Sequence, residues 1–378
     1  MSWRSASLNA YFAYTVSFGM SLLSGTLIPV IPLFAFRMGA SQIELGIVGS
    51  AAPLIYVPLT FVTGRLSDRL GRKPLIAASA LIYAIACVLY FISSSPTHLI
   101  VVKLIEGLST ALLWPPVEAL LADNAFLNGY ALVANFGASW SLGTTIGALI
   151  SSWAIGTGRY GDVFLPAAIF SLAFSLATLL IISDIRAKLQ GEEGPISEQG
   201  SATPSQFSSV WLAAFIYAFC QGIVFALYPP YADTRGVPTF IIGLVVTSLM
   251  LGRTLVFISF RRIRGRFKIL ITTGSAIIGL TILPLSLTID PWIILPLSLM
   301  LGFGVGLIYA ASIMVALSVD KASRGKYAGF FEGSIGAGYF FGPIIGGSIA
   351  QVVLQGPYAI CSIAALISLL SIIRSKIK

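Results

Sequence analysis

The chain has few charged residues. Only 10% of its 378 residues are Asp, Glu, Lys or Arg, whereas 57% are hydrophobic. Ordinary soluble domains carry roughly 25% charged residues, so a water-soluble fold of this length is excluded. Apolar runs of about 20 residues recur along the chain, which is the length that an α-helix needs to cross a bilayer. A transmembrane β-barrel would instead alternate polar and apolar residues in segments of about ten, so the pattern predicts an all-α membrane protein.

Histidine and cysteine are scarce as well, which argues against catalysis. The single histidine, His98, is expected in a short loop, and Cys87, Cys220 and Cys361 lie far apart without the spacing of a metal site. The sequence contains no HExxH motif, P-loop or nucleophile elbow. We therefore predict a protein that is not an enzyme and that uses no metal and no cofactor.

The apolar runs predict twelve transmembrane helices, at residues 8–36, 42–65, 74–94, 98–122, 128–156, 162–183, 207–232, 238–260, 268–289, 291–318, 325–353 and 356–373. Under this assignment 18 of the 23 Lys and Arg fall on one side of the membrane, whereas only Arg37, Arg159 and Arg235 fall on the other. The positive-inside rule places the basic side, with both termini, in the cytoplasm. The net charge of +9 thus indicates topology in the plasma membrane rather than binding to nucleic acid.

Residues 184–206 have no apolar periodicity and mix Glu and Pro with Gly, Ser and Gln. They are expected to form a cytoplasmic linker between two six-helix bundles, residues 1–183 and 207–378. Several residues recur at an offset of 197 between these bundles, the pairs being Pro32/Pro229, Gly39/Gly236, Gly46/Gly243, Gly107/Gly304 and Asp123/Asp320. Two parallel repeats of this kind are an architecture of secondary transporters, whose binding site lies between the halves.

The loop after the second span reads Gly64-Arg65-Leu66-Ser67-Asp68-Arg69-Leu70-Gly71-Arg72-Lys73-Pro74. It resembles the cytoplasmic signature of the major facilitator superfamily, in which Gly64, Asp68, Arg69, Gly71 and Arg72 are the marked positions. The resemblance implies that Asp68 faces the start of span 11 and that Arg72 joins Asp123 at the inner end of span 4, which would hold the cytoplasmic side closed. A loop that only sets topology and anchors lipid phosphates is the alternative. The second half departs from the signature, because residues 260–268 contain no acid.

Span 11 contains Gly338, Gly342, Pro343, Gly346 and Gly347. This run resembles the family's glycine-proline helix signature and is expected to serve helix packing. In the family's exporters the signature typically lies on span 5, whereas span 5 of this chain has Gly143 and Gly147 without the proline. That departure weakens an assignment as a drug antiporter.

Five ionisable residues are expected inside spans: Lys103, Glu106, Glu118, Arg253 and Glu332. An ionisable side chain at the centre of a span costs about 2.5–3.5 kcal/mol on insertion scales, so each is a functional hypothesis. Lys103, Glu106 and Glu118 share one helical face with Trp114, and the family resemblance implies that span 4 lines the central cavity. Lys103 and Glu106 can pair at i, i+3, and a purely structural pair is the competing interpretation. Arg253 and Glu332 lie at equal depth, which permits a salt bridge, with Glu118 as another partner for Arg253.

These residues lead to a hypothesis of mechanism. Glu332, Glu118 or Glu106 takes up a proton on one side of the membrane and releases it on the other, which couples protons to the movement of a small-molecule solute. Gln221 on span 7 is a further substrate candidate, because an amide in hydrocarbon needs a partner. The preferred function is a proton-coupled exporter of amphipathic or organic compounds that works as a monomer by alternating access. An uptake symporter for a sugar or organic acid is the alternative, and saturable, gradient-stimulated flux would separate either carrier from a channel or a receptor.

Overall fold

The computed structural model describes residues 3–123, 129–181, 204–262, 266–317 and 321–375, and these fold into α-helices and short connections without a β-strand. The helices are α1 (Trp3–Arg37), α2 (Gln42–Leu70), α3 (Arg72–Ile92), α4 (Pro96–Asp123), α5 (Gly129–Gly156), α6 (Phe164–Ile181), α7 (Pro204–Thr234), α8 (Thr239–Ser259), α9 (Phe267–Leu287), α10 (Pro291–Leu317), α11 (Lys321–Ala350) and α12 (Gly356–Arg374). Two short 3₁₀ helices, η1 (Tyr160–Val163) and η2 (Phe260–Arg262), lie between them.

Each of the twelve expected spans corresponds to one of these helices, so the predicted all-α membrane fold is confirmed. Ten of the described helices are long and apolar enough to cross a membrane. The largest differences at helix ends are of five residues. One is the start of α1, at Trp3 rather than residue 8, and the other is the end of α2, which continues beyond the expected residue 65 and carries Arg65, Asp68 and Arg69 on its last turns. Charged side chains ended the apolar run but not the helix, because an α-helix satisfies its own backbone hydrogen bonds in water as well as in lipid. The expected linker falls almost wholly outside the described residues, and the domain boundaries therefore stay a prediction.

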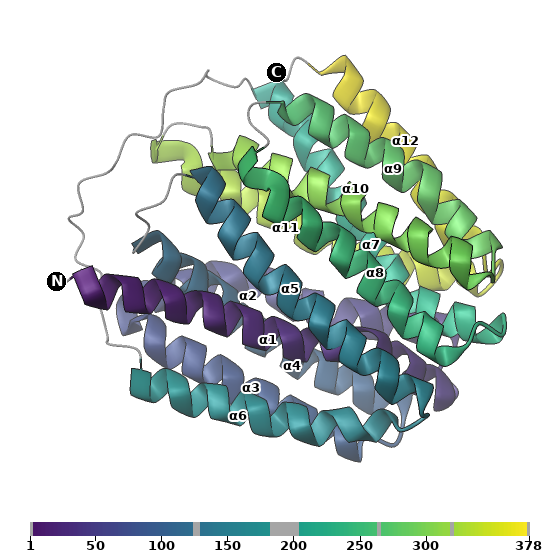
Figure 1. The fold of residues 1–378 in the computed structure, drawn as a ribbon, viewed down its shortest axis with the longest axis horizontal. Coiled ribbons are helices and arrows are strands. Elements are labelled where there is room, and N and C mark those ends of the chain that lie inside the picture. The colour runs from purple at the N-terminus through teal and green to yellow at the C-terminus, as the bar shows by residue number, and fades with distance from the viewer. Residues whose placement is uncertain (1–2, 124–128, 182–203, 263–265, 318–320, 376–378) are drawn as a thin grey trace.

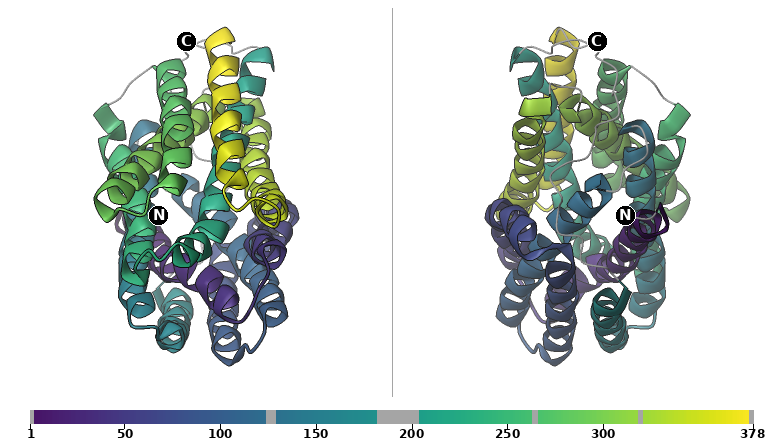
Figure 2. Two further views of the ribbon diagram at one scale, coloured as in Figure 1. Left: turned by 90° about the vertical axis from the view of Figure 1, so that its right-hand side faces the viewer. Right: turned by 90° about the vertical axis from the view of Figure 1, so that its left-hand side faces the viewer.

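The helices form two halves, α1–α6 and α7–α12 (Figures 1 and 2). Within the first half α1 packs on α5, α2 on α4, and α3 on α6; within the second α7 packs on α11, α8 on α10, and α9 on α12. The halves meet where α2 lies along α11, where α5 lies along α8, and where α1 contacts α7. We call the end of the molecule that carries the last turns of α2 the signature end, and the opposite end, which carries the last turns of α1 and α7, the far end.

Glycines bring the backbones of neighbouring helices together in the same way in both halves. In the first half, Gly143 and Gly147 of α5 lie against the carbonyl oxygens of Phe18 and Leu22 of α1. In the second half, Gly338 and Gly342 of α11 lie against those of Phe215 and Phe219 of α7. The carbonyls are related by 197 residues and the glycines by 195. The internal repeat is therefore a repeat of packing as well as of sequence.

The change of offset corrects one predicted pair. Gly107 of α4 packs on the carbonyl oxygen of Ala52, and its counterpart is Gly302 of α10, which packs on that of Leu249, whereas Gly304 faces Gly274 of α9. The offset changes because α2 and α8 start 197 residues apart, whereas α3 and α9 start 195 apart. The stretch from the start of α8 to the start of α9 is thus two residues shorter than the stretch from the start of α2 to the start of α3, which contains the signature loop. Residue 320 lies outside the described residues, and the Asp123/Asp320 pair stays a prediction.

At the far end, α1 and α7 end in matching turns. Gly39 and Gly236 have φ of 88° and 79°, a conformation in which a side chain would be strained. The backbone hydrogen bonds match as well, since the amide of Ala40 donates to the oxygen of Ala35 and that of Val237 to the oxygen of Ala232, both at 3.0 Å. These turns set the direction in which the chain leaves α1 and α7, the two helices that contact each other across the halves.

Candidate functional site

A cavity of about 350 Å³ lies between the two halves, within the range of roughly 300–1,000 Å³ of small-molecule sites. Its walls come from α1, α2, α4 and α5 of one half and from α7, α8, α10 and α11 of the other. Eight of the 22 lining residues are aromatic, namely Tyr56, Trp114, Phe136, Trp140, Tyr217, Phe225, Tyr309 and Tyr339. Glu106, Glu118, Arg253 and Glu332, four of the five ionisable residues expected inside spans, line the same cavity.

Tyr309 of α10 lies at the centre of the aromatic lining. Its ring centroid lies 5.7 Å from that of Trp140 on α5 and 5.5 Å from that of Phe331 on α11. Both contacts are edge-to-face, the geometry in which aromatic rings attract each other. A wall built in this way offers broad apolar contact, and the rings are held by their neighbours rather than free to turn.

Glu118 of α4 and Glu332 of α11 are the two acids of the cavity that lack a partner. Their carboxylates interact electrostatically, and they come from opposite halves. Among the described residues, neither makes a hydrogen bond or a salt bridge. The side chain of Glu118 is exposed, and since it lines the cavity it faces whatever fills that space. Two like charges without a counter-ion leave room for a proton or a cation.

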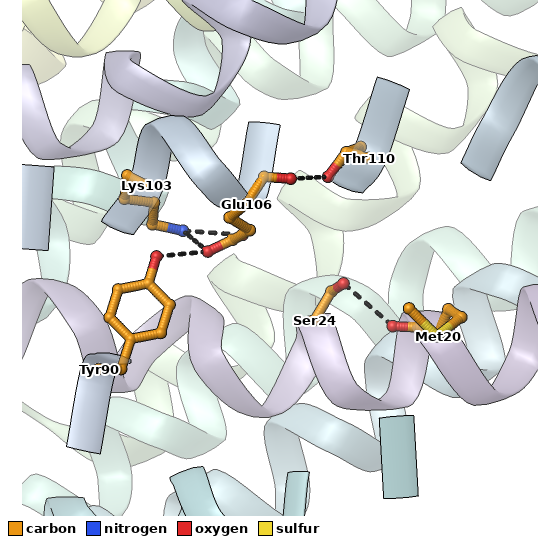
Figure 3. Close-up of polar contacts among 6 residues, drawn as sticks. All are labelled: Met20, Ser24, Tyr90, Lys103, Glu106 and Thr110. Carbon is orange, nitrogen blue, oxygen red and sulfur yellow. Dashed lines mark hydrogen bonds and ion pairs between the residues drawn. The ribbon is translucent and has the colours of Figure 1, made fainter. Parts of the chain in front are cut away.

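Glu106 is held differently, as Figure 3 shows. Its carboxylate lies 2.9 Å from Nζ of Lys103 and accepts a hydrogen bond of 2.6 Å from the hydroxyl of Tyr90 on α3. The expected i, i+3 pair is thus present, with Tyr90 as a third member that the sequence reasoning missed. The carbonyl oxygen of Glu106 accepts from the hydroxyl of Thr110 at 2.8 Å. The Lys103–Glu106 pair carries no net charge and satisfies its own polar atoms.

Arg253 of α8 is only 5% exposed and stacks on the indole of Trp140, with Cζ 4.2 Å from the ring centroid. Its Nε donates to Oγ of Ser141 at 3.2 Å and its Nη2 to Sδ of Met250 at 2.9 Å. Within the described part of the chain no carboxylate lies within salt-bridge distance of Arg253, so the bridges considered with Glu332 and Glu118 are not formed. The reason is the packing of α8 along α5, which places the guanidinium over an aromatic face.

Gln221 lies in the wall of the second half, on α7 between Tyr217 and Phe225. Its Oε1 accepts a hydrogen bond of 2.6 Å from the hydroxyl of Tyr339. The side chain is buried, with 1% of its surface exposed. Its Nε2 has no hydrogen-bond partner among the described residues. The hydrogen-bond partner predicted for this amide is therefore present at its oxygen, whereas its nitrogen has none among the described residues.

The signature loop lies outside the cavity. Gly64 has no atom within 4 Å of the position that a Cβ would take, whereas Gly71 ends α2 with φ of 94°, a conformation that requires glycine. Arg72 is buried and donates to Oδ1 of Asp68 at 2.6 Å, while Arg69 is exposed. The Asp123 side chain and the side chains of residues 321–326, which start α11, lie outside the described residues. The predicted contacts of Asp68 with α11 and of Arg72 with Asp123 thus stay predictions.

The glycine-proline run of α11 packs on two helices. Gly338, Gly342 and Gly346 face α7 of the same half. Pro343 and Gly347 face Gly46 and neighbouring atoms of α2 in the opposite half. The run therefore forms both an internal contact of the second half and part of the contact between the halves.

The internal repeat accounts for part of the apolar wall of the cavity but not for its acidic residues. At offsets of 197 and 195, Ile28 matches Phe225 and Trp114 matches Tyr309, and all four line the cavity. The acids have no acidic match, because the counterparts of Glu106, Glu118 and Glu332 are Leu301, Ile313 and Gly137. Building the repeated wall does not require these charges. Their presence in the bilayer, where a charge is costly, is best explained by function.

Several lining residues were not predicted. Tyr56, Phe136, Phe225 and Tyr339 line the cavity. Matching the two halves at the corrected offset would have found some of them, since Tyr56 is the counterpart of Arg253 and Thr144 of Tyr339. In the described residues no group of His, Cys, Asp and Glu has the arrangement of a metal site.

Comparison with known proteins agrees with this architecture. The family model of the Major Facilitator Superfamily matches residues 13–318. The chain is 21% identical over 344 residues to the quinolone resistance protein NorA of Staphylococcus aureus (strain MRSA252), covering 88% of this chain and 87% of that protein. It is 22% identical over 361 residues to multidrug resistance protein 1 of Bacillus subtilis (strain 168), covering 91% and 90%.

Solved structures share the fold at lower identity. The nucleoside transporter NupG, in the structure of a point mutant, matches with a TM-score of 0.77 and 15% identity, over 97% of this chain and all of that one. The human organic anion transporter MFSD10 matches with a TM-score of 0.68 and 16% identity, over 97% and 99%. The chain is a multi-pass membrane transporter and not an enzyme, and it belongs to the major facilitator superfamily of secondary transporters.

Proposed function

We propose that the chain exports amphipathic organic cations in exchange for protons. The observation that carries the proposal is that Glu118 and Glu332 line one aromatic cavity from opposite halves without a partner among the described residues. Two basic side chains of the spans have other contacts, since Lys103 pairs with Glu106 and Arg253 stacks on Trp140. An aromatic wall attracts organic cations through its π faces. The relatives named for quinolone and multidrug resistance support export as the direction.

The coupling follows from electrostatics. A proton on Glu118 or Glu332 removes the repulsion between the two carboxylates, and so does a bound cation. The two occupants exclude each other, because each neutralises the same charge. Since the carboxylates belong to different halves, a movement of the halves that changes their separation favours the neutralised state. Exchange of one proton for one cation by alternating access follows, with the signature end facing the cytoplasm as the basic residues indicate.

The test is a Glu→Gln series in proteoliposomes with an imposed pH gradient. Flux of a fluorescent lipophilic cation and cation–cation exchange are measured separately for Glu118→Gln, Glu332→Gln and the double variant. The double variant should lose gradient-driven flux and most cation–cation exchange as well, because the proton and the cation use the same two carboxylates. Ser334→Ala on α11 is a control, because its hydroxyl donates to the carbonyl of Phe330 on its own helix. Full gradient-driven flux in the double variant would refute the proposal.

Uptake of an organic acid or a sugar is the second candidate, and Arg253 favours it. Its guanidinium lines the cavity without a carboxylate and would bind an anionic solute. Arg253→Gln decides between the two. If an acid is the solute, this variant loses binding of benzoate, and if a cation is the solute, it binds tetraphenylphosphonium at least as well as the wild type.

A further inference from the structure

Gln221 leaves one polar group unsatisfied at the wall of the cavity. Its Nε2 has no hydrogen-bond partner among the described residues, and the side chain is 1% exposed. A buried donor without an acceptor is destabilising, and such groups in folded proteins call for an explanation. Packing provides none, because Met or Leu would fill the same volume without the unsatisfied amide.

Three neighbours of the Gln221 amide line the cavity. Tyr217 and Phe225, four residues before and after Gln221 on α7, both line the cavity, and residues at this spacing share a helical face. Tyr339, which donates to Oε1 of Gln221 at 2.6 Å, lines it too. The amide is therefore one hydrogen bond behind the wall, and a small turn of Tyr339 or Phe225 would expose it.

The matching position in the first half has a different chemistry. At the offset of 197, Ser24 of α1 corresponds to Gln221 and lines the cavity. The hydroxyl of Ser24 donates to the carbonyl oxygen of Met20 at 3.0 Å (Figure 3), so its donor is used within its own helix. Of these two matched positions in the described chain, Gln221 therefore has a donor without an acceptor, whereas Ser24 does not. Because the two helices are repeats of each other, the repeated backbone does not account for this difference.

We propose that Gln221 and Tyr339 form a neutral subsite that accepts a carbonyl or ether oxygen of the solute. The amide –NH₂ of Gln221 donates to that oxygen, while the hydroxyl of Tyr339 holds the amide in place through Oε1. The subsite selects solutes that carry an acceptor oxygen near their aromatic part. It rests on the proposed function in one respect, namely that the solute binds in this cavity, and it does not depend on the solute's charge.

The test uses two pairs of probes that differ by one carbonyl. The cationic pair is 2-phenylethyl-trimethylammonium and phenacyl-trimethylammonium, and the neutral pair is ethylbenzene and acetophenone. Binding of each probe to the purified full-length protein is measured for the wild type, Gln221→Met and Tyr339→Phe. Tyr358→Phe is the matched control, since the hydroxyl of Tyr358 is also buried without a partner in the described residues but lies among Tyr228 and Tyr231, away from the cavity.

The wild type should bind the carbonyl member of a pair more tightly by roughly three- to tenfold, the worth of one neutral hydrogen bond. Gln221→Met should remove this preference, Tyr339→Phe should reduce it, and Tyr358→Phe should keep it. Thermal stability of ligand-free Gln221→Met should stay close to that of the wild type, because the variant removes an unsatisfied donor but also the acceptor of the Tyr339 hydroxyl. A structural role would instead lower its stability and weaken all probes equally.

The outcomes separate this inference from the proposed function. If the cationic probes do not bind but the neutral pair shows the carbonyl preference through Gln221, the subsite stands and the cationic substrate class fails. If cations bind through Glu118 and Glu332 but Gln221→Met changes neither pair, the function stands and the subsite is refuted. A wild type without carbonyl preference in either pair also overturns the subsite.

Discussion

Arg37, the last residue of α1, forms an ion pair with Asp233 near the end of α7, with Nη2 2.7 Å from Oδ1. The contact joins the two halves at the far end, directly before the matching turns at Gly39 and Gly236. The other arginine at this end of α7, Arg235, donates to the hydroxyl of Tyr231 at 2.7 Å and to the carbonyl oxygen of Ser286 at 3.2 Å. Arg235 therefore ties α7 to α9 within one half, whereas Arg37 crosses between halves.

We predict that reversing Arg37 to Glu opens the far end, because two acids would then repel each other where α1 meets α7. The measurement is the labelling rate of Ile28→Cys, a cavity position, by a membrane-impermeant maleimide applied from the far side. Cys87, Cys220 and Cys361 are first replaced by Ser. Labelling should be faster by about two- to fivefold, the size of a partly exposed ion pair of up to roughly 1 kcal/mol. The swap Arg37→Glu with Asp233→Arg should restore the slow rate, and an unchanged rate in the single variant would contradict the role.

The second prediction concerns pH. A proton and a cation compete for Glu118 and Glu332, so affinity for a lipophilic cation should rise with pH as the carboxylates lose their proton. The double Gln variant cannot titrate at these positions and should bind with a nearly constant, low affinity across the same range. Both affinities are measured by tryptophan fluorescence quenching with tetraphenylphosphonium from about pH 4 to about pH 9, a range that covers the ordinary pKa of a glutamate, about 4.3, and the higher values known for protein carboxyls. A wild-type affinity that is independent of pH would be incompatible with competition.

The third prediction concerns the Lys103–Glu106 pair. Lys103→Met leaves the carboxylate of Glu106 in a largely enclosed site with Tyr90 as its remaining side-chain partner, which should lower stability by roughly 1–3 kcal/mol. Adding Glu106→Gln removes the unpaired charge and should recover most of this loss. Apparent melting temperatures in detergent measure the stability of the wild type, of Lys103→Met and of the double variant. If the single and double variants are equally destabilised, the pair contributes packing rather than charge compensation.

The fourth prediction compares two glycines. Gly342→Val would drive a side chain into the backbone of Phe219 on α7, and overpacking of this kind costs about 1–3 kcal/mol. Gly64→Ala meets no atom within 4 Å and should leave stability unchanged or slightly raised, since alanine favours a helix more than glycine. Size-exclusion profiles and melting temperatures of both variants provide the comparison. A well-behaved Gly342→Val protein would show that α7 and α11 can separate without loss.

The sequence predicts those features that depend on neighbours along one helix. Twelve spans, the Lys103–Glu106 pair and the packing role of Gly342 follow from hydrophobic length, from i, i+3 spacing and from the absence of a side chain. Contacts between helices do not follow in the same way. Arg253 lies on Trp140 rather than beside Glu332, because its partner depends on how α8 is rotated against α5, and helix rotation is set by packing that no single segment encodes.

The repeat shows the same limit. A constant offset of 197 predicts the turns at Gly39 and Gly236, which precede the connection that differs between the halves. It fails at Gly107, because the stretch from the start of α8 to the start of α9 is two residues shorter than its counterpart and shifts every later position by two residues. Tyr90 was missed for another reason. It lies on α3, a helix that does not line the cavity, and it reaches the site only through the carboxylate of Glu106.

The two-sided run on α11 has a consequence for any movement of the halves. Near Pro343, where α11 meets α2, the touching atoms belong to Gly46, Gly49, Pro343 and Gly347, residues that have no long side chains to interdigitate. This stretch of the contact is smooth, whereas further along it Ser50 donates to the carbonyl oxygen of Phe340 and Val57 packs on Gly336. The opposite edge of α11 is seated on the carbonyls of α7. In the proposed alternating access, α11 would therefore move with α7 as part of one half, and its glycine-proline stretch would be the surface on which the other half slides.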